Sequence, residues 1–483
     1  MGLIEQFAQQ TIDAGAFEAL DKVYVENKIR ALVGDEDVAA KPGKLVPQLV
    51  DLAVSRGKIE DGQTAREILN DQLYDLLTPT PAAVNHAFWQ KHLAAPKKAT
   101  NWFYQLCTTN DYVKVEAIKK NIVFNETVKD GNELEITINL SKPEKDPKAI
   151  AAAAHATAKK YPQCALCLEN EGYLGRLGQA ARSNHRVIRL TVGGQRWGFQ
   201  YSPYAYFNEH CIFLDTVHEP MKIDQQTLVN LVEIERQFPH YFVGSNADLP
   251  IVGGSMLAHE HYQGGRHTFP MMKAKIKQEL HFDNFPAVAA GVVDWPMSDI
   301  RLTSTDATQL IQLGTHIMDC WNHYDDEALQ IKAFDADGNR HHTVTPIMHR
   351  EGAAYVLDLV LRDNNTSDQY PLGIFHPHEE LWHIKKENIG LIEVMGRAIL
   401  PARLKDELAE VKKFWLGQDN QMTEAHRPWA EEVKNRRTID QANVDQVLHE
   451  EVAEVFSAVL ADAGVFKNDE AGQAGWARFL KVL

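Results

Sequence analysis

The sequence predicts an α+β fold in which a helical N-terminal region precedes largely antiparallel sheet with flanking helices. Three observations lead to this prediction. Apolar residues recur every three or four positions over the first ~80 residues, which is the period of an amphipathic helix. From residue 150 onward, alternating segments with Gly-rich turns dominate, and helical segments lie among them. Strands and helices that are segregated rather than regularly alternating are typical of α+β proteins.

The N-terminal region contains two clear helical patterns, in residues 11–32 and 64–79, and the second ends in a proline stop at Pro79 and Pro81. A DG turn, an alternating strand and a charged, proline-containing linker follow in residues 129–149. We therefore place a boundary near residue 150. The expected organisation is a mainly helical region over 1–150, a first sheet-containing part over 151–300, and a second such part with C-terminal helices over 301–483.

Beyond the boundary, each element has a local signal. Residues 185–215 predict two or three strands around the Gly193-Gly194 turn, and residues 224–238 predict an amphipathic helix. A strand and a Gly-rich loop are expected in residues 240–257. Another strand is expected in 353–364, and a helix in 400–416.

The composition excludes several classes of protein. The 483 residues are 44% hydrophobic and 24% charged, an ordinary globular balance, and no apolar run approaches the ~20 residues of a membrane helix. The first ten residues lack the features of a signal peptide, so we expect a cytoplasmic protein without a membrane partner. The net charge is −16 and no basic block is present, which argues against a nucleic-acid partner. Five cysteines without a secretory context argue against a disulfide framework.

The most informative segment is AHEHYQGGRHTFPM, residues 258–271, which holds three histidines. A zincin helix would need a second histidine at position 263, where Gln263 stands, so that interpretation fails. A cupin-type metal site fits His259 and His261 but lacks the glutamate that should follow. In an extended strand, His259 and His261 would point to the same face.

Nucleotidyl transfer through a phosphorylated histidine fits the segment better. This chemistry needs a neutral imidazole aimed at phosphorus, together with donors for the transferred phosphate. His261 supplies the imidazole, and Gln263 and the backbone N–H groups of Gly264-Gly265 supply donors at close range. A histidine-rich loop satisfied by buried hydrogen bonds is the structural alternative.

At these residues the chain resembles a known family. GGSMLAHEHYQGGRHTFP looks like the active-site segment of the galactose-1-phosphate uridylyltransferases, in the longer of their two classes, within the histidine-triad superfamily. Further similar segments follow in order between residues 150 and 405; they are YPQCALCLENEGYLGR, QYSPYAYFNEHCIF, LDLVLRDN, GIFHPH and HIKKENIGLIEVMGRAILPARL. The shorter class has His-Pro-His-Gly-Gln where this chain has Glu260 and Tyr262, yet both histidines and the glutamine stay in register.

The resemblance implies a ping-pong reaction. UDP-glucose gives its uridylyl group to a histidine and releases glucose 1-phosphate, and galactose 1-phosphate then takes the group to form UDP-galactose. Residue by residue, His261 would be the nucleophile and Gln263 would hold the phosphoryl oxygens. The resemblance also implies two related histidine-triad-like antiparallel halves and a homodimer.

Cys164 and Cys167 have the spacing of half a zinc site. The resemblance implies that His259 and His218 complete it, giving a closed structural zinc site of Cys164, Cys167, His218 and His259. A reduced, buried cysteine pair is the alternative. A second divalent metal is also considered, although its site is not assigned.

The resemblance places further residues near the substrate. Asn246 and Ser255 lie on the loop where relatives contact ribose and phosphate, Lys386 aligns with a sugar-phosphate lysine, and Glu393 is a candidate for the sugar hydroxyls. Turn hydrogen bonding and a solvated lysine are the ordinary alternatives. His376 and His378 repeat the H-x-H pattern, and the sequence leaves open whether they bind metal, line the substrate pocket or are structural.

Two other functions compete with this interpretation. A dinucleoside-polyphosphate phosphorylase or hydrolase of the same superfamily would use His261 on adenylyl groups. A non-catalytic zinc-binding interaction protein would leave His261 and Gln263 without a purpose. Labelling of the protein by UDP-glucose would distinguish the three.

Overall fold

The computed structural model describes residues 2–141, 161–176 and 178–483. The described residues form two compact units. The first unit comprises those within Met1–Glu116, Lys142–Ala205 and Cys211–His218, and the second comprises Ala117–Ser141, Tyr206–His210 and Glu219–Leu483. The predicted boundary near residue 150 lies outside the described residues.

The first unit begins with helices, as the apolar periodicity predicts. Their bounds are α1 (Leu3–Asp13), α2 (Lys22–Val33), α3 (Leu45–Ser55), α4 (Gln63–Asp75), α5 (Pro81–Ala94) and α6 (Pro96–Thr109). The short α7 (Val115–Ile118) begins in this unit, and its last two residues belong to the second. Buried Phe7, Ile29, Leu49 and Leu73 pack α1 to α4 around one apolar core. The pattern in residues 11–32 is not one helix, because the chain turns after α1 at Gly15, whose φ is +75°.

Proline acts in the first unit as a helix start. Pro81 is the first residue of α5, and the side chain of Thr80 accepts a hydrogen bond from the backbone N–H of Ala83. This is the favoured position for proline, because the missing N–H would have no partner in the first turn. Helix α4 ends at Asp75, before Pro79, so the predicted stop is confirmed, and Pro81 opens the next helix.

Three antiparallel strands complete the first unit. They are β3 (Ile188–Val192), β4 (Gln195–Tyr201) and β5 (Cys211–Asp215), in the order β3-β4-β5. Gly193 and Gly194 join β3 to β4 with φ values of +57° and +76°, which a two-residue hairpin turn requires. The prediction of strands around this turn is confirmed.

The second unit contains two sheets. Strands β7 (His261–Gly265), β6 (Phe242–Gly244), β11 (His342–Glu351), β12 (Ala354–Asp363), β10 (Asp299–Ser304), β9 (Ala289–Val293) and β8 (Ile276–Leu280) follow one another as antiparallel neighbours. The smaller sheet has β2 (Glu133–Ile138) at its centre, antiparallel to β1 (Ile122–Thr127) and parallel to β13 (Arg397–Leu400). The α+β class with largely antiparallel sheet is confirmed.

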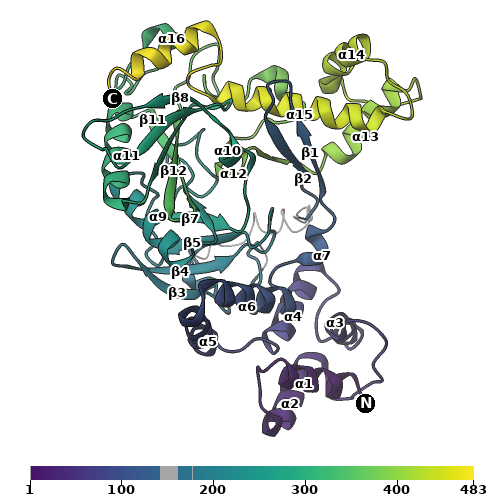
Figure 1. Ribbon diagram of the computed structural model, residues 1–483. Helices are drawn as coiled ribbons and strands as arrows, with labels where there is room; N and C mark the ends of the chain where they lie inside the picture. The colour runs from purple at the N-terminus through teal and green to yellow at the C-terminus, as the bar shows by residue number, and fades with distance from the viewer. Residues whose placement is uncertain (1, 142–160, 177) are drawn as a thin grey trace. The chain divides into compact units, whose positions relative to one another are not determined.

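Helices flank these sheets. They are α9 (Gln225–Gln237), α10 (Pro270–Lys273), α11 (Ala307–Asn322), α12 (Leu391–Val394), α13 (Leu404–Trp415), α14 (Arg427–Arg436), α15 (Val444–Ala463) and α16 (Glu470–Phe479). The shorter 3-10 helices are η1 (Ala19–Asp21), η2 (Leu168–Asn170), η3 (Glu327–Leu329), η4 (Glu379–Leu381) and η5 (Glu424–His426). In Figure 1, α9 and α11 lie beside β11.

The predicted helices near residues 224–238 and 400–416 are confirmed as α9 and α13. Asp224 caps α9 by accepting from the backbone N–H groups of Gln226 and Thr227. Leu228 and Leu231 are among the apolar residues that α9 buries. No helix among the described residues is long and apolar enough to cross a membrane.

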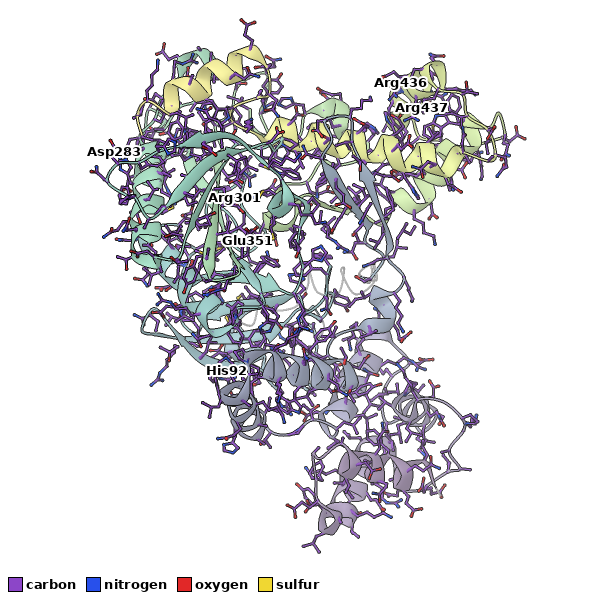
Figure 2. The ribbon with its side chains drawn as sticks, viewed as in Figure 1. His92, Asp283, Arg301, Glu351, Arg436 and Arg437 are labelled. Carbon is purple, nitrogen blue, oxygen red and sulfur yellow. The ribbon has the colours of Figure 1, made fainter. Side chains whose placement is uncertain are left out.

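Arg301 ties the larger sheet to the helix that follows the histidine segment. Its Nε donates to Asp358 at 2.6 Å, and its terminal nitrogens donate to the backbone carbonyls of Met271 and Ala274. Figure 2 labels Arg301 among the strands of this sheet. These bonds fix α10 directly after the segment that carries His261.

Candidate active site

Strand β7 presents the predicted nucleophile. Its register with β6 pairs Gly244 with Gln263 and Val243 with Gly264. Because side chains alternate along a strand, His261 and Gln263 lie on one face, and Tyr262 points to the other. Tyr262 is buried there, and its hydroxyl accepts from the side-chain amide of Asn230 at 3.0 Å. This contact fixes the face that His261 shows.

The ring of His261 is buried, with 5% exposure, and its Nδ1 lies 2.7 Å from the backbone carbonyl of His259. A carbonyl oxygen only accepts, so the ring proton is on Nδ1 and the lone pair is on Nε2. Burial lowers the pKa of His261 to about 4, which keeps the imidazole neutral near pH 7. A neutral ring with a lone pair at Nε2 is the form that attacks phosphorus.

His259 is not on the same strand as His261. Strand β7 begins at His261, so the expectation of one strand carrying both rings is wrong. Between them, Glu260 is tied to the chain that precedes α9: its N–H donates to the carbonyl of Glu219, and its carboxylate accepts from the N–H of Lys222. Because Glu260 makes these bonds, residues 259 and 260 lie before the start of β7 and are not part of it.

Gln263 has a buried histidine partner. Its Oε1 lies 2.9 Å from Nε2 of His210, whose side chain belongs to the same unit. Burial lowers the pKa of His210 to about 4, and the positive charge of Arg397 acts in the same direction. His210 is not among the residues predicted from the sequence, although it lies in one of the segments that carry the family resemblance.

The predicted metal ligands form a group. One ligand atom from each of Cys164, Cys167, His218 and His259 lies within 4.8 Å of the others. The sulfur atoms of the two cysteines are 3.5 Å apart, and Nδ1 of His218 is 3.2 Å from Sγ of Cys167. Tetrahedral zinc with ordinary bond lengths places such atoms about 3.3 to 3.8 Å apart. Two thiols and two imidazoles are therefore a set of residues that fits zinc.

Asn246 lies on the loop after β6 and is buried. Its Oδ1 accepts from the backbone N–H of Leu391 at 2.8 Å, which leaves the Nδ2 hydrogens as the donors of this side chain. A Cβ added to Gly254 would lie 2.7 Å from Nδ2 of Asn246. The Gly-rich loop thus passes close over this amide because it has no side chain at that position.

Two other predicted residues lie near this loop in sequence. Ser255 is exposed on the loop that leads to the histidine segment, and Gly264 is buried within β7. The hydroxyl of Ser255 is therefore accessible to a ligand, whereas Gly264 offers only its backbone.

The lysine and glutamate candidates have different environments. Lys386 is exposed, and its ammonium lies 4.4 Å from the ring centre of Trp382. Its neighbour Lys385, which the sequence analysis did not identify, is buried and pairs with Glu393. Glu393 also accepts from the backbone N–H of Gly390 at 2.8 Å. Glu393 is thus held by contacts within the chain as well as being a candidate for the sugar hydroxyls.

His376 and His378 do not converge on one point. The ring of His376 contacts the carbonyl of Pro377 and the side chain of Asn388. The ring of His378 contacts the carbonyl of Ile374 at 3.0 Å and stacks on Tyr370 at 4.1 Å between ring centres. These contacts favour a structural role among the three that the sequence left open.

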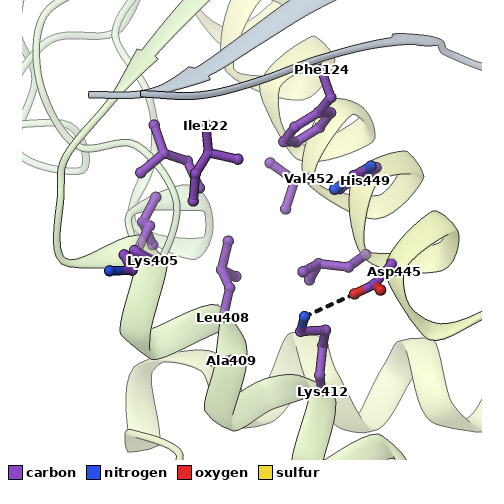
Figure 3. Close-up of a pocket in the computed structure, with 12 residues that line it drawn as sticks. Ile122, Phe124, Lys405, Leu408, Ala409, Lys412, Asp445, His449 and Val452 are labelled. Atoms are coloured by element: carbon purple, nitrogen blue, oxygen red, sulfur yellow. Dashed lines mark hydrogen bonds and ion pairs between the residues drawn. The ribbon is translucent and has the colours of Figure 1, made fainter. Parts of the chain in front are cut away.

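A cavity of about 110 Å³ lies elsewhere in the second unit, between the smaller sheet and helices α13 and α15. Figure 3 shows Phe124, Leu408 and His449 on its wall and the ion pair between Lys412 and Asp445 at its edge. Its described lining residues include none of the predicted site residues.

Comparisons with known proteins show the family of the chain. The family model described as "Galactose-1-phosphate uridyl transferase, N-terminal domain" matches residues 15–220, and that of the C-terminal domain matches residues 233–431. The chain is 66% identical to a galactose-1-phosphate uridylyltransferase of Lactobacillus helveticus, covering 100% of this chain and 99% of that one. It is 57% identical to that of Pediococcus pentosaceus, covering 100% of both chains. A solved structure of yeast Ap4A phosphorylase with Ap4A is 12% identical, with a TM-score of 0.35, covering 72% of this chain and 96% of that one.

Proposed function

Because the chain belongs to the galactose-1-phosphate uridylyltransferase family, we propose that it transfers a uridylyl group from UDP-glucose to galactose 1-phosphate. The products are UDP-galactose and glucose 1-phosphate. One structural observation supports the mechanism more than any other. The hydrogen bond from Nδ1 of His261 to the carbonyl of His259 leaves Nε2 as the nucleophilic atom.

The reaction proceeds in two displacements. In the first, the lone pair on Nε2 of His261 forms a bond to the α-phosphorus of UDP-glucose, and the bond from that phosphorus to the bridging oxygen breaks. Glucose 1-phosphate leaves with the electron pair. In the second, a phosphate oxygen of galactose 1-phosphate attacks the same phosphorus, and the N–P bond returns its electrons to Nε2.

The environment of His261 suits both displacements. The ring keeps its proton on Nδ1, so it becomes positively charged when Nε2 bonds to phosphorus. The carbonyl of His259, 2.7 Å away, stabilises that charge through a hydrogen bond that strengthens as it develops. The buried ring is neutral before the reaction and is therefore ready to attack.

Donors for the phosphoryl oxygens come from the same strand. The side-chain amide of Gln263 lies on the face of His261, and the chain continues through Gly264 without a side chain to block the approach. On the neighbouring loop, Nδ2 of Asn246 and the hydroxyl of Ser255 are further donors for phosphate or ribose. Lys386 is proposed for the phosphate of the hexose 1-phosphate, and Glu393 for the sugar hydroxyls.

Zinc is the proposed metal of the group formed by Cys164, Cys167, His218 and His259. Four protein ligands would leave it no position for a reactive water, so when bound it would supply rigidity rather than chemistry. A bound zinc would fix the position of His259, whose backbone carbonyl accepts the hydrogen bond from Nδ1 of His261. No step of the reaction involves the metal.

Intact mass after mixing the protein with UDP-glucose, without an acceptor, tests the proposal. We expect a gain equal to one uridylyl group, which galactose 1-phosphate discharges. If UDP-glucose binds and no gain occurs, the covalent mechanism is wrong. If only an adenylyl donor labels the protein, it handles dinucleoside polyphosphates instead.

A further inference from the structure

We propose that His210 is a positioning residue that orients the amide of Gln263 so that its N–H group faces the transferred phosphoryl group. This inference rests on the proposed function, because Gln263 has this role only in uridylyl transfer. It assigns a purpose to a buried histidine that does not itself reach the substrate.

The contact joins a buried histidine to a half-buried glutamine. Nε2 of His210 lies 2.9 Å from Oε1 of Gln263, and only 4% of His210 is exposed. Its ring centre is 4.5 Å from that of Phe207 and 5.6 Å from that of Tyr206, at interplanar angles of 33° and 28°. The two aromatic rings restrict the imidazole to an orientation that directs Nε2 at Gln263.

The direction of this hydrogen bond decides which end of the Gln263 amide is left for a ligand. A neutral imidazole carries one N–H. Among the described residues, Nδ1 of His210 has no hydrogen-bond partner, and burying an unpaired N–H costs more than burying a bare nitrogen beside aromatic rings. The proton therefore belongs on Nε2, which donates to Oε1 of Gln263.

With Oε1 occupied in this way, the NH₂ group of Gln263 points away from His210. It can then donate to an anionic oxygen, which is what the phosphoryl group requires. The reverse orientation would aim the carbonyl oxygen of the amide at the phosphoryl oxygens and repel them. His210 thus selects the productive orientation of a side chain that could otherwise rotate by a half-turn.

The segment that carries His210 is itself fastened to the end of β7. The backbone N–H of Arg266 donates to the carbonyl of Asn208 at 3.1 Å, and its guanidinium pairs with Glu209 at 3.1 Å. Glu209 has a φ of +55°, a conformation that non-glycine residues rarely adopt, and its carboxylate accepts from the hydroxyl of Tyr241. This strained turn directs the next residue, His210, at Gln263.

The chain offers a matched control. In the first unit, Nε2 of His185 lies 2.9 Å from Oε1 of Gln200, and His185 is also buried and stacks on an aromatic ring, that of Tyr112. The two pairs share residue types, distance and a buried histidine, whereas Gln200 is buried and Gln263 is half-buried. Only the pair that contains Gln263 lies beside the nucleophile in sequence.

The experiment measures the rate of uridylylation by UDP-glucose in a single turnover, the affinity for UDP-glucose by calorimetry, and the melting temperature. The variants are His210→Phe, which keeps a ring without a donor, His210→Gln, which keeps a donor near the Nε2 position, and His185→Phe. Gln263→Ala and the double variant His210→Phe/Gln263→Ala complete a cycle.

We expect His210→Phe to lower the rate on the order of 10²-fold, as loss of one oriented donor does. UDP-glucose affinity should change no more than about threefold. His210→Gln should restore most of the rate, and His185→Phe should react like the wild type. The double variant should be no slower than Gln263→Ala, because His210 acts only through Gln263. If His210→Phe does not fold, His210→Asn, whose shorter amide falls short of Gln263, takes its place in every comparison.

A wild-type rate in folded His210→Phe would overturn the inference, as would losses that multiply in the double variant. An equal loss in His185→Phe would also overturn it by showing a general effect of buried histidine replacement. Labelling of the wild type separates these results from the proposed function. If the wild type is not labelled, the proposed function fails and the positioning role fails with it; if it is labelled, the variants decide the role of His210 alone.

Discussion

The Nδ1 atom of His261 donates a hydrogen bond to the backbone carbonyl of His259 across 2.7 Å. His259 takes part in two features of the site. Its side chain belongs to the candidate metal-binding group of Cys164, Cys167, His218 and His259, and its backbone carbonyl sets the tautomer of His261. A backbone carbonyl cannot change its protonation state, so it holds the tautomer wherever the His261 ring is neutral, above its pKa of about 4. A fixed backbone at His259 therefore keeps the ring of His261 in the orientation and tautomer that leave Nε2 free to attack.

His261→Ala should abolish uridylylation, because no other atom takes the place of Nε2. His267→Ala is a control from the same segment. His267 contacts Glu135 at 2.9 Å, and Glu135 keeps Arg397 as a second partner. We expect this control to be labelled and to lose about 1 kcal/mol of unfolding free energy. Intact mass and urea unfolding check both variants, and labelling of His261→Ala would assign the nucleophile elsewhere.

Cys164→Ser should lose bound zinc and unfold more easily, because a three-ligand site holds the metal less tightly. We expect a loss of about 3 kcal/mol or more in unfolding free energy, with any loss of turnover following the loss of zinc. Cys320→Ser, a half-buried cysteine on α11 outside the metal group, is the control. Metal analysis and melting curves measure the effect. Full zinc content and unchanged stability in Cys164→Ser would remove the structural role of the site.

Features that depend on local sequence patterns could be predicted, whereas contacts between distant parts of the chain could not. Helix α9, the turn at Gly193-Gly194 and the pairing of Cys164 with Cys167 follow from spacing within short segments, whereas His218 and His259 came from the family resemblance. The bond between His210 and Gln263 spans 53 positions and depends on strand neighbours that no local pattern reveals.

The choice between adjacent residues was equally hard to predict. Lys385 is buried against Glu393 and Lys386 is exposed, although both stand in the same KKE sequence. The difference depends on which face of the chain meets the core, and charge patterning does not show that. The start of β7 at His261 depends likewise on bonds from Glu260 to distant backbone.

Gly265→Ala should destabilise the protein and slow uridylylation. Gly265 has a φ of +147°, and a Cβ there would lie 2.6 Å from the carbonyl oxygen of Glu209. Relief of this clash must move the turn that holds His210, so we expect a loss of about 2 to 4 kcal/mol in unfolding free energy.

Gly352→Ala is the matched control, because its φ is also positive, at +59°, while the added Cβ meets nothing within 4 Å. Its cost should stay near 1 kcal/mol with normal labelling. Equal losses of stability in urea unfolding would mean that backbone strain alone, not the contact with Glu209, accounts for the effect.

Asp299→Asn should make the protein more stable than the wild type, by a margin that grows with pH. Asp299 is fully buried, and burial together with the neighbouring charge of Asp358 raises its pKa well above its ordinary value. In the unfolded chain this carboxyl loses its proton near pH 4, whereas in the folded protein it keeps it to higher pH. Between the unfolded and the folded pKa of Asp299, the folded state therefore binds more protons than the unfolded state. Stability falls as pH rises through this range, by up to about 1.4 kcal/mol per pH unit.

Asparagine is neutral throughout and can still donate to Oδ2 of Asp358, which has no partner among the described residues. Urea unfolding of both proteins at pH 5, 6, 7 and 8 measures the difference. A difference that does not change with pH would show that Asp299 is already ionised in the folded protein, with Arg301 compensating both carboxylates.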